Sequence, residues 1–260
     1  MFKICTIASS SKGNCSFITD GETNILIDCG IKINELNRFC LENDIEPSKI
    51  NAVVITHEHI DHICGLKSVT KKIHPDIYCH EFIGKHINER LNINLDYIDV
   101  DMDGFKIGNI NVLPFKTSHD AIFPLGYTFF EGDKRVSIAT DLGIVKDNVI
   151  ENLENSDMAI IEANHDRQML IQGVYPTMLK RRVVGSMGHL SNDESARLIS
   201  HLCEHRLRKV ILAHLSENNN LPELAYSTVS NYLQKNEKLK NVDIEIEVAP
   251  AKEPCKFLEV

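Results

Sequence analysis

Three histidines and an aspartate lie within seven residues, in the stretch THEHIDH at residues 56–62. Imidazole and carboxylate groups are common ligands of zinc, manganese and iron ions. In a helix, His57 and His59 would point about 200° apart, whereas in an extended segment they point to the same side. We therefore expect an extended metal-binding loop after the apolar run NAVVI. The alternative is a polar loop whose histidines bond to the backbone.

Asp61 and His62 belong to the turn into the next helix, so they can face a different point from His57 and His59. One short loop can thus serve two ions that lie a few ångströms apart. The ligand types suit a divalent ion but favour neither zinc nor manganese.

A loop of this length cannot fill two coordination shells, so further ligands must come from other parts of the chain. His119 follows VLPFKTS, Asp141 follows VSIAT and His214 follows VILA, each at the end of an apolar run. Taken singly, each is equally consistent with a capping or core residue. Together with the loop they form a set of candidate ligands. Asp28, at the end of NILID, is expected to orient a ligand histidine or the loop.

These residues must be positioned by strands and helices that alternate along the chain. Runs rich in β-forming residues predict strands at 2–7, 15–19, 23–30, 51–56, 76–80, 109–115, 124–131, 135–141, 158–163 and 209–215. Amphipathic spacing predicts helices at 33–41, 65–73, 81–91, 177–184, 192–204 and 221–234. Two β-rich halves that each end in helices predict two sheets packed face to face, with helices outside.

The composition is that of a packed globular protein, with 43% hydrophobic and 25% charged residues among 260. We expect one domain over residues 1–260. No run approaches the roughly 18 apolar residues of a membrane span, and the first residues lack a signal-peptide core. Eight scattered cysteines without a CxxC pair suit reduced thiols in the cytoplasm. A net charge of −9 disfavours a protein coated by nucleic acid, but not a nuclease with local basic residues.

The order Asp28, HEHIDH, His119, Asp141 and His214 resembles the five motifs of the metallo-β-lactamase fold superfamily. The resemblance spans nearly the whole chain and implies an α/β fold, a four-layered αβ/βα sandwich, with two divalent ions at one edge of the sheets. It implies that one ion is held by His57, His59 and His119, the other by Asp61, His62 and His214, with Asp141 as the bridge.

Several branches of the superfamily are disfavoured. In flavodiiron oxygen reductases this motif resembles HxExD, whereas here the position of the glutamate is occupied by His59. Many true β-lactamases have an arginine in place of His62 and carry a ligand cysteine. The presence of His62 and Asp141 in this chain disfavours that branch. The segment between Asp141 and His214 has no insertion of the size of a β-CASP domain.

Two downstream segments favour a nuclease branch. GHLSNDESARLIS, followed by LRKVILAHLS, is similar to the tRNase Z pattern, and AIIEANHD resembles the strand of that family that ends in a paired glutamate. The segments IASSSKGNC, NHD…YP..LKRR and HLSENNN are similar to WalJ/YycJ-type exonucleases, although Lys12 replaces a small residue. This resemblance implies a metal-dependent exonuclease that acts 5′-to-3′ and on DNA rather than RNA.

Hydrolysis of a phosphodiester needs a nucleophile, neutralised phosphoryl oxygens and a proton for the leaving alkoxide. Two ions about 3.5–4 Å apart supply the first two. Asp61, bound to metal through one oxygen, could accept the water proton with the other. His189, held by Glu162, is the candidate acid; alternatively it bonds to backbone beside Ser191, a helix cap. His165 is expected to support the site or touch the substrate, and is otherwise a surface residue.

Two further segments are candidates for contact with the substrate. The loop at residues 9–14 could offer amides and hydroxyls to a phosphate, or it could be a tight turn. The LKRR run could grip backbone phosphates, or it could be a solvated helix face. The candidate residues are Ser10, Ser11, Asn14, Lys180, Arg181 and Arg182.

Three classes of function remain open. The first is a nuclease, with nucleic acid as its partner. The second is a hydrolase of a small ester, thioester or cyclic phosphodiester on the same metals, which the Glu162–His189 acid pair disfavours. The third is a binding module that retains metal without turnover, which the complete ligand set disfavours. The sequence gives no indication of the oligomeric state.

Overall fold

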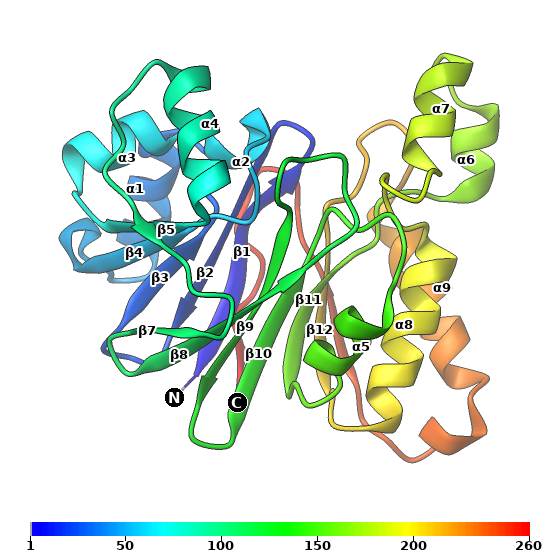
Figure 1. Ribbon diagram of the computed structural model, residues 1–260. Coiled ribbons are helices and arrows are strands. Elements are labelled where there is room, and N and C mark those ends of the chain that lie inside the picture. Colours follow the sequence, from blue (N-terminus) through cyan, green and yellow to red (C-terminus); the bar gives the residue numbers. More distant parts are fainter. Residues whose placement is uncertain (1) are drawn as a thin grey trace.

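The computed structural model describes residues 2–260 and has four layers, with two sheets at the centre and helices outside each (Figure 1). This arrangement confirms the predicted αβ/βα sandwich. The strands are β1 (Lys3–Ser10), β2 (Gly13–Thr19), β3 (Asn24–Ile27), β4 (Ile50–Val54), β5 (Asp76–Cys79), β6 (Ile98–Asp99), β7 (Phe105–Ile107), β8 (Ile110–Lys116), β9 (Leu125–Glu131), β10 (Lys134–Ala139), β11 (Met158–Glu162), β12 (Lys209–Ala213), β13 (Glu245–Val248) and β14 (Leu258–Glu259).

Most of the longer helices cover the outer faces of the sheets. The helices are α1 (Ile33–Glu42), α2 (Ile60–Ile63), α3 (Leu66–Lys72), α4 (Glu81–Leu91), α5 (Asp147–Leu153), α6 (Arg167–Gln172), α7 (Thr177–Val183), α8 (Asn192–Glu204) and α9 (Pro222–Gln234), with short 3-10 helices η1 (Pro47–Lys49) and η2 (Glu237–Leu239). Helices α1, α3 and α4 lie outside one sheet, and α5, α8 and α9 lie outside the other (Figure 1).

The two sheets have the same plan. The described residues form one seven-stranded sheet in the order β14-β1-β2-β3-β4-β5-β6 and another in the order β13-β12-β11-β10-β9-β8-β7. In the first sheet β3, β4, β5 and β6 run parallel, and in the second β10, β11, β12 and β13 do so. Because parallel strands end at the same edge of a sheet, the residues that follow them can gather at one place.

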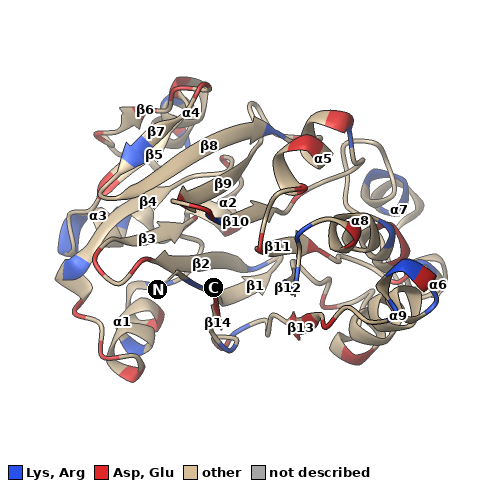
Figure 2. Ribbon diagram, turned by 90° about the horizontal axis from the view of Figure 1, so that it is seen from below, with Lys and Arg blue, Asp and Glu red and all other residues tan. Residues whose placement is uncertain are grey.

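The core explains why the central strands are so apolar. Phe17 and Phe39 pack edge to face at 5.4 Å between ring centroids, which joins the first sheet to α1. Strand β11 is buried along its whole length, as a parallel strand covered on both faces should be. Charged residues lie mainly on the helices and loops, while most of β9, β10 and β11 carries none (Figure 2).

The elements that were not predicted are short or half-exposed. They are α2, α5, α6, β6, β7, β13, β14 and the 3-10 helices η1 and η2; β14 has two residues, which pair with β1. The predicted longer helices are confirmed with shifts of one residue at most. All eight cysteines are free. None of the helices formed by residues 2–260 combines the length and apolar character needed to cross a membrane.

Candidate metal centre

The predicted ligands gather at one edge of the two sheets. Asp28 follows β3, His57 follows β4, His119 follows β8, Asp141 follows β10 and His214 follows β12. The short helix α2 lies at this edge, at the top of the view between the two halves (Figure 1). Residues from five separated parts of the sequence are therefore brought into one cluster by the ends of strands.

Three of these residues have an unusual backbone. Asp28, Asp141 and His214 have positive φ angles of 61°, 55° and 57°. This left-handed conformation costs a non-glycine residue roughly 1–2 kcal/mol. Strained residues of this kind cluster at functional sites, where the surrounding structure holds them in place.

The first group of side chains consists of His57, His59 and His119, whose offered ring nitrogens all lie within 4.8 Å of one another. His59 is extended, with φ −65° and ψ 146°, so it stays on the same side as His57. The Nδ1 atoms of His57 and His119 lie 3.0 Å from Thr56 Oγ1 and 3.1 Å from the Gly188 carbonyl oxygen, so the Nε2 atoms are the ones left to face the cluster. The Nε2 atom of His119 lies 3.3 Å from His59 Nδ1. Burial and the neighbouring imidazoles lower the pKa of His57, which favours the neutral form that binds metal.

The second group consists of Asp61, His62 and His214, and their offered atoms also lie within 4.8 Å of one another. Burial alone would raise the pKa of Asp61, but the contacts with His214 and His62 hold that pKa well below its usual value. Asn14 Nδ2 donates to Asp61 Oδ2 at 3.1 Å and lies 3.1 Å from His62 Nε2. This predicted substrate residue thus touches the candidate ligands directly.

Asp141 lies between the two groups. Its Oδ1 is 3.5 Å from His119 Nε2, and its Oδ2 is 3.3 Å from His62 Nε2. The Oδ2 atom of Asp141 and the Nε2 atoms of His57 and His214 are buried and have no hydrogen-bond partner. Buried polar atoms without partners are rare and need an explanation. Buried imidazole nitrogens and carboxylate oxygens without partners fit ligands of divalent cations.

Asp28 fixes one of the ligand rings. Its Oδ2 lies 2.7 Å from His62 Nδ1 and accepts a hydrogen bond from Thr56 Oγ1, while its Oδ1 accepts one from the Thr56 backbone N–H, both at 2.8 Å. The contact with Nδ1 leaves His62 Nε2 facing the cluster. A carboxylate in this position sets the tautomer and the orientation of a ligand histidine.

Glu162, the fully buried last residue of β11, contacts two histidines at once. Its Oε1 lies 2.8 Å from both His189 Nδ1 and His214 Nδ1, and its Oε2 accepts the backbone N–H groups of Leu142 and Leu190 at 3.0 Å. Burial would raise the pKa of Glu162, but the two rings hold it well below its usual value. The ionised carboxylate therefore ties a candidate ligand to the candidate acid.

His189 lies two residues before Ser191, the cap of α8, and the first turn of this helix has a capping box. Ser191 Oγ accepts the Glu194 N–H, and Glu194 Oε2 accepts the Ser191 N–H at 2.9 Å. Ser191 is thus the predicted cap. The His189 ring, however, contacts Glu162 rather than the backbone.

A sequence model described as "Beta-lactamase superfamily domain" matches residues 23–215, which is most of the chain. The chain belongs to the β-lactamase superfamily. It is 33% identical to "Exodeoxyribonuclease WalJ" of Streptococcus pneumoniae over 256 residues, which cover 94% of this chain and 93% of the relative. It is 30% identical to "Exodeoxyribonuclease YycJ" of Bacillus anthracis over 232 residues, covering 88% of each chain. This superfamily member is therefore an enzyme of the WalJ/YycJ type.

Solved structures of the superfamily have the same fold. The metallo-β-lactamase fold protein YhfI from Bacillus subtilis aligns with a TM-score of 0.72 and 17% identity, and the alignment covers 100% of both chains. An identity this low carries the fold and no more.

A cavity of about 220 Å³ opens over the cluster of this superfamily member. Asp61, His189 and His214 line it, together with Ser11 and Arg182 from the predicted substrate set. Arg182 Nε and Nη2 pair with Asp120 Oδ2 and Oδ1 at 2.6 and 3.0 Å. Asp120 was not among the predicted residues, although it directly follows His119 and its Oδ1 lies 3.4 Å from His119 Nε2.

Other predicted substrate residues lie elsewhere. Ser10 lines a neighbouring cavity on the other side of the β1–β2 turn, and its Oγ accepts the Lys12 backbone N–H. Lys180 donates to the Ile171 carbonyl oxygen at 2.6 Å. Arg181 is exposed and does not line the cavity over the cluster. His165, expected to support the site, is buried, and its Nδ1 has no hydrogen-bond partner.

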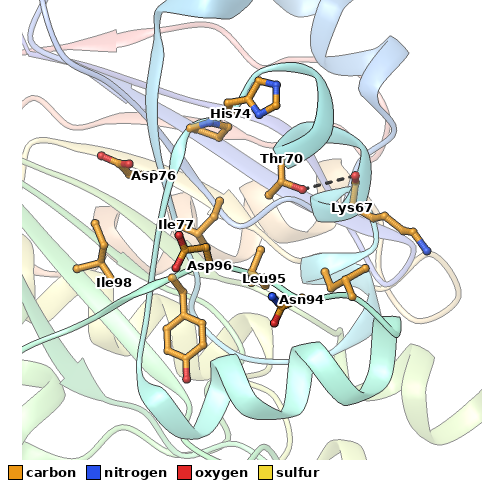
Figure 3. Close-up of a pocket in the computed structure, with 12 residues that line it drawn as sticks. Lys67, Thr70, His74, Asp76, Ile77, Asn94, Leu95, Asp96 and Ile98 are labelled. Atoms are coloured by element: carbon orange, nitrogen blue, oxygen red, sulfur yellow. Dashed lines mark hydrogen bonds between the residues drawn. The ribbon is translucent and has the colours of Figure 1, made fainter.

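A second cavity, of about 450 Å³, is larger than the one over the cluster (Figure 3). Lys67, Thr70, Asp76 and Asp96 are among the residues that line it, and none of the predicted site residues does. Volume alone would thus favour this second cavity, whereas the grouped ligand atoms and the strained backbone favour the edge of the sheets.

Replacing Asp28 by asparagine should weaken metal binding about 10–100-fold, the usual effect of losing a carboxylate behind a ligand histidine. Asparagine tolerates the left-handed backbone, so the fold should persist. Competition with a chelator measures the affinity. Asp44→Asn is a matched control, because Asp44 is exposed and has a similar φ of 54°. Equal metal affinity in both variants would contradict this role of Asp28.

Proposed function

We propose that the protein is a metal-dependent exonuclease that hydrolyses DNA rather than RNA in the 5′-to-3′ direction. The observation that carries the proposal is the His189–Glu162 pair beside the ligand cluster, in a chain 33% identical to an exodeoxyribonuclease. Two divalent ions, zinc or manganese, and a cytoplasmic location are parts of the proposal. The free cysteines support that location.

In this proposal His57, His59 and His119 would hold one ion, Asp61, His62 and His214 would hold the other, and Asp141 would be a ligand of both. The ions, when bound, lower the pKa of a water and neutralise charge on the phosphoryl oxygens. The Asp61 side chain is 19% exposed and lines the cavity, so its carboxylate would be placed to accept the proton of that water.

His189 supplies the proton that the leaving alkoxide needs. Its Nδ1 is held by Glu162, and its side chain, 12% exposed, lines the cavity, so Nε2 is the nitrogen available to the substrate. A carboxylate bonded to the other ring nitrogen orients the imidazole and stabilises its charged form. The pair thereby acts as a positioned general acid.

Arg182 is placed to bind a phosphate of the substrate strand. Arg182 lines the cavity, and its Nε and Nη2 pair with Asp120, so Nη1 is the nitrogen that can donate to a phosphate. Ser11, in the β1–β2 turn, lines the cavity as well and can donate its hydroxyl.

Replacing Arg182 by alanine should weaken binding of DNA, raise KM more than it lowers kcat, and reduce the salt dependence of binding by about one phosphate contact. The measurement is KM and affinity at several salt concentrations. Arg181→Ala is the matched control, since that neighbouring arginine is exposed and does not line the cavity. The same salt slope in both variants would remove Arg182 from the substrate contacts.

The test of the proposal uses metal-loaded protein on end-labelled DNA, end-labelled RNA and bis-p-nitrophenyl phosphate. Progressive shortening of DNA is expected, with RNA cleaved more slowly. DNA blocked at its 5′ end should resist, and DNA blocked at its 3′ end should not. If nucleic acids stay intact while a small ester is cleaved, the site belongs to a small-molecule hydrolase instead.

A further inference from the structure

A second group of metal-capable side chains lies between α5 and α8. Glu154 is the C-cap of α5, and His201 and His205 lie at the end of α8. Residues four apart on a helix share one face, so the two rings lie next to each other, with centroids 5.0 Å apart. A carboxylate from one helix thus meets two imidazoles from another.

The distances suit a single ion. Glu154 Oε1 is 2.8 Å from His201 Nε2 and 3.7 Å from His205 Nε2, and the three offered atoms lie within 4.8 Å of one another. Zinc bonds of about 2.0–2.1 Å in tetrahedral geometry separate neighbouring ligand atoms by about 3.3 Å. Both measured distances lie within about half an ångström of that separation, so small rotations of the rings are sufficient.

The carboxylate of this group comes from α5 and not from α8. Glu204 lies between the two histidines in the sequence, but it pairs with Lys238 and accepts a hydrogen bond from Asn236 Nδ2 at 2.8 Å. Among the described residues Glu154 has no such lysine or arginine partner, and it forms ion pairs with the two histidines. It is therefore free to act as a ligand.

We propose that Glu154, His201 and His205 bind a divalent cation of the late first transition series, such as zinc, at a site separate from the cluster at the sheet edge. Two imidazoles and one carboxylate select such ions over magnesium and calcium, which prefer oxygen ligands. The His201 side chain is 43% exposed, His205 46% and Glu154 30%. Water can therefore fill the remaining coordination positions of the ion.

The site is distant from the predicted catalytic residues and would connect two helices. Helix α8 has 13 residues, which corresponds to about 20 Å, and His189 lies before its other end. A cavity of about 400 Å³, lined by Ile144, Ile150, Leu198 and His201, lies between α8 and the segment around α5. Figure 1 shows α5 beside α8. An ion at this place would hold the two helices together at the edge of that cavity and stabilise the fold.

The test counts ions in chelator-stripped protein dialysed against micromolar Zn²⁺. Wild type should hold one more zinc per chain than His205→Ala or His201→Ala, and Glu154→Gln should bind that ion at least about tenfold more weakly. His86→Ala, which changes a histidine of α4, is the matched control and should bind as wild type does. Addition of Ni²⁺ to zinc-free protein should broaden the NMR signals of the His201 and His205 rings first among the histidines outside the sheet-edge cluster.

The variants should keep wild-type circular dichroism and the same activity, since none of the changed residues lies near the proposed catalytic site. Failure of the nuclease proposal would leave this count unaffected, because it needs no substrate. Equal zinc content in wild type and both histidine variants overturns the proposal, and so does an extra ion that binds only at millimolar zinc.

Discussion

Replacing His189 by alanine is expected to slow cleavage of DNA about 10²–10⁴-fold while the metal content stays unchanged. The imidazole is held by Glu162 at 2.8 Å and lines the cavity over the cluster, so its proposed task is to give a proton to the leaving oxygen. The measurements are kcat on end-labelled DNA and metal per chain by elemental analysis.

The leaving group provides a control for this prediction. The p-nitrophenolate released from bis-p-nitrophenyl phosphate is a weak base and needs little help from an acid, so His189→Ala should slow its release far less. A loss of equal size on both substrates would show that His189 positions the substrate or the ions. A loss of metal would make it a ligand.

Replacing Asp141 by asparagine is expected to remove most of the bound metal and to bring DNA cleavage close to background. The two carboxylate oxygens lie 3.5 Å from His119 Nε2 and 3.3 Å from His62 Nε2, so one side chain faces both groups of ligands. Loss of a residue that supports a ligand weakens metal affinity about 10–100-fold. Asp141 is proposed to bind the ions directly, so its loss should weaken metal affinity by more than that.

Asparagine is the suitable replacement because it tolerates the φ of 55° at this position, whereas alanine would add backbone strain. Metal per chain after dialysis is the measurement, and Asp44→Asn is the control with the same chemistry at an exposed left-handed position. Full metal occupancy in Asp141→Asn would contradict its placement between two ions.

The fold could be predicted because long elements have clear periodicity. The helix predicted at 192–204 is α8, and the apolar runs before Asp28, His57 and His214 are β3, β4 and β12. Helix α5 was not predicted, although α3 and α7, which also have seven residues, were. Strand β13 is half-buried along its length and β14 has two residues, so neither has a distinct apolar pattern.

The candidate ligands could be predicted because they lie singly at the ends of apolar strands. Contacts between distant segments leave no such local pattern. The position of Glu162 at the end of a strand was visible, but its second contact, with His214, depends on how β11 and β12 pair. The pairing of Arg182 with Asp120 joins residues 62 positions apart, and nothing near either residue indicates it. Contacts of this kind become visible only in the folded chain.

The left-handed backbone at Asp28, Asp141 and His214 has a consequence for how this enzyme can be engineered. Glycine would relieve the backbone strain at each position but would remove side-chain contacts such as those of Asp28 with Thr56 and His62. Where the relief exceeds that loss, selection for thermostability alone would favour glycine. Such variants could fold more tightly in metal-free form and yet lose the chemistry. A search for more thermostable variants of this protein should therefore measure catalysis together with melting temperature, because a substitution at these three positions can raise the melting temperature and abolish activity.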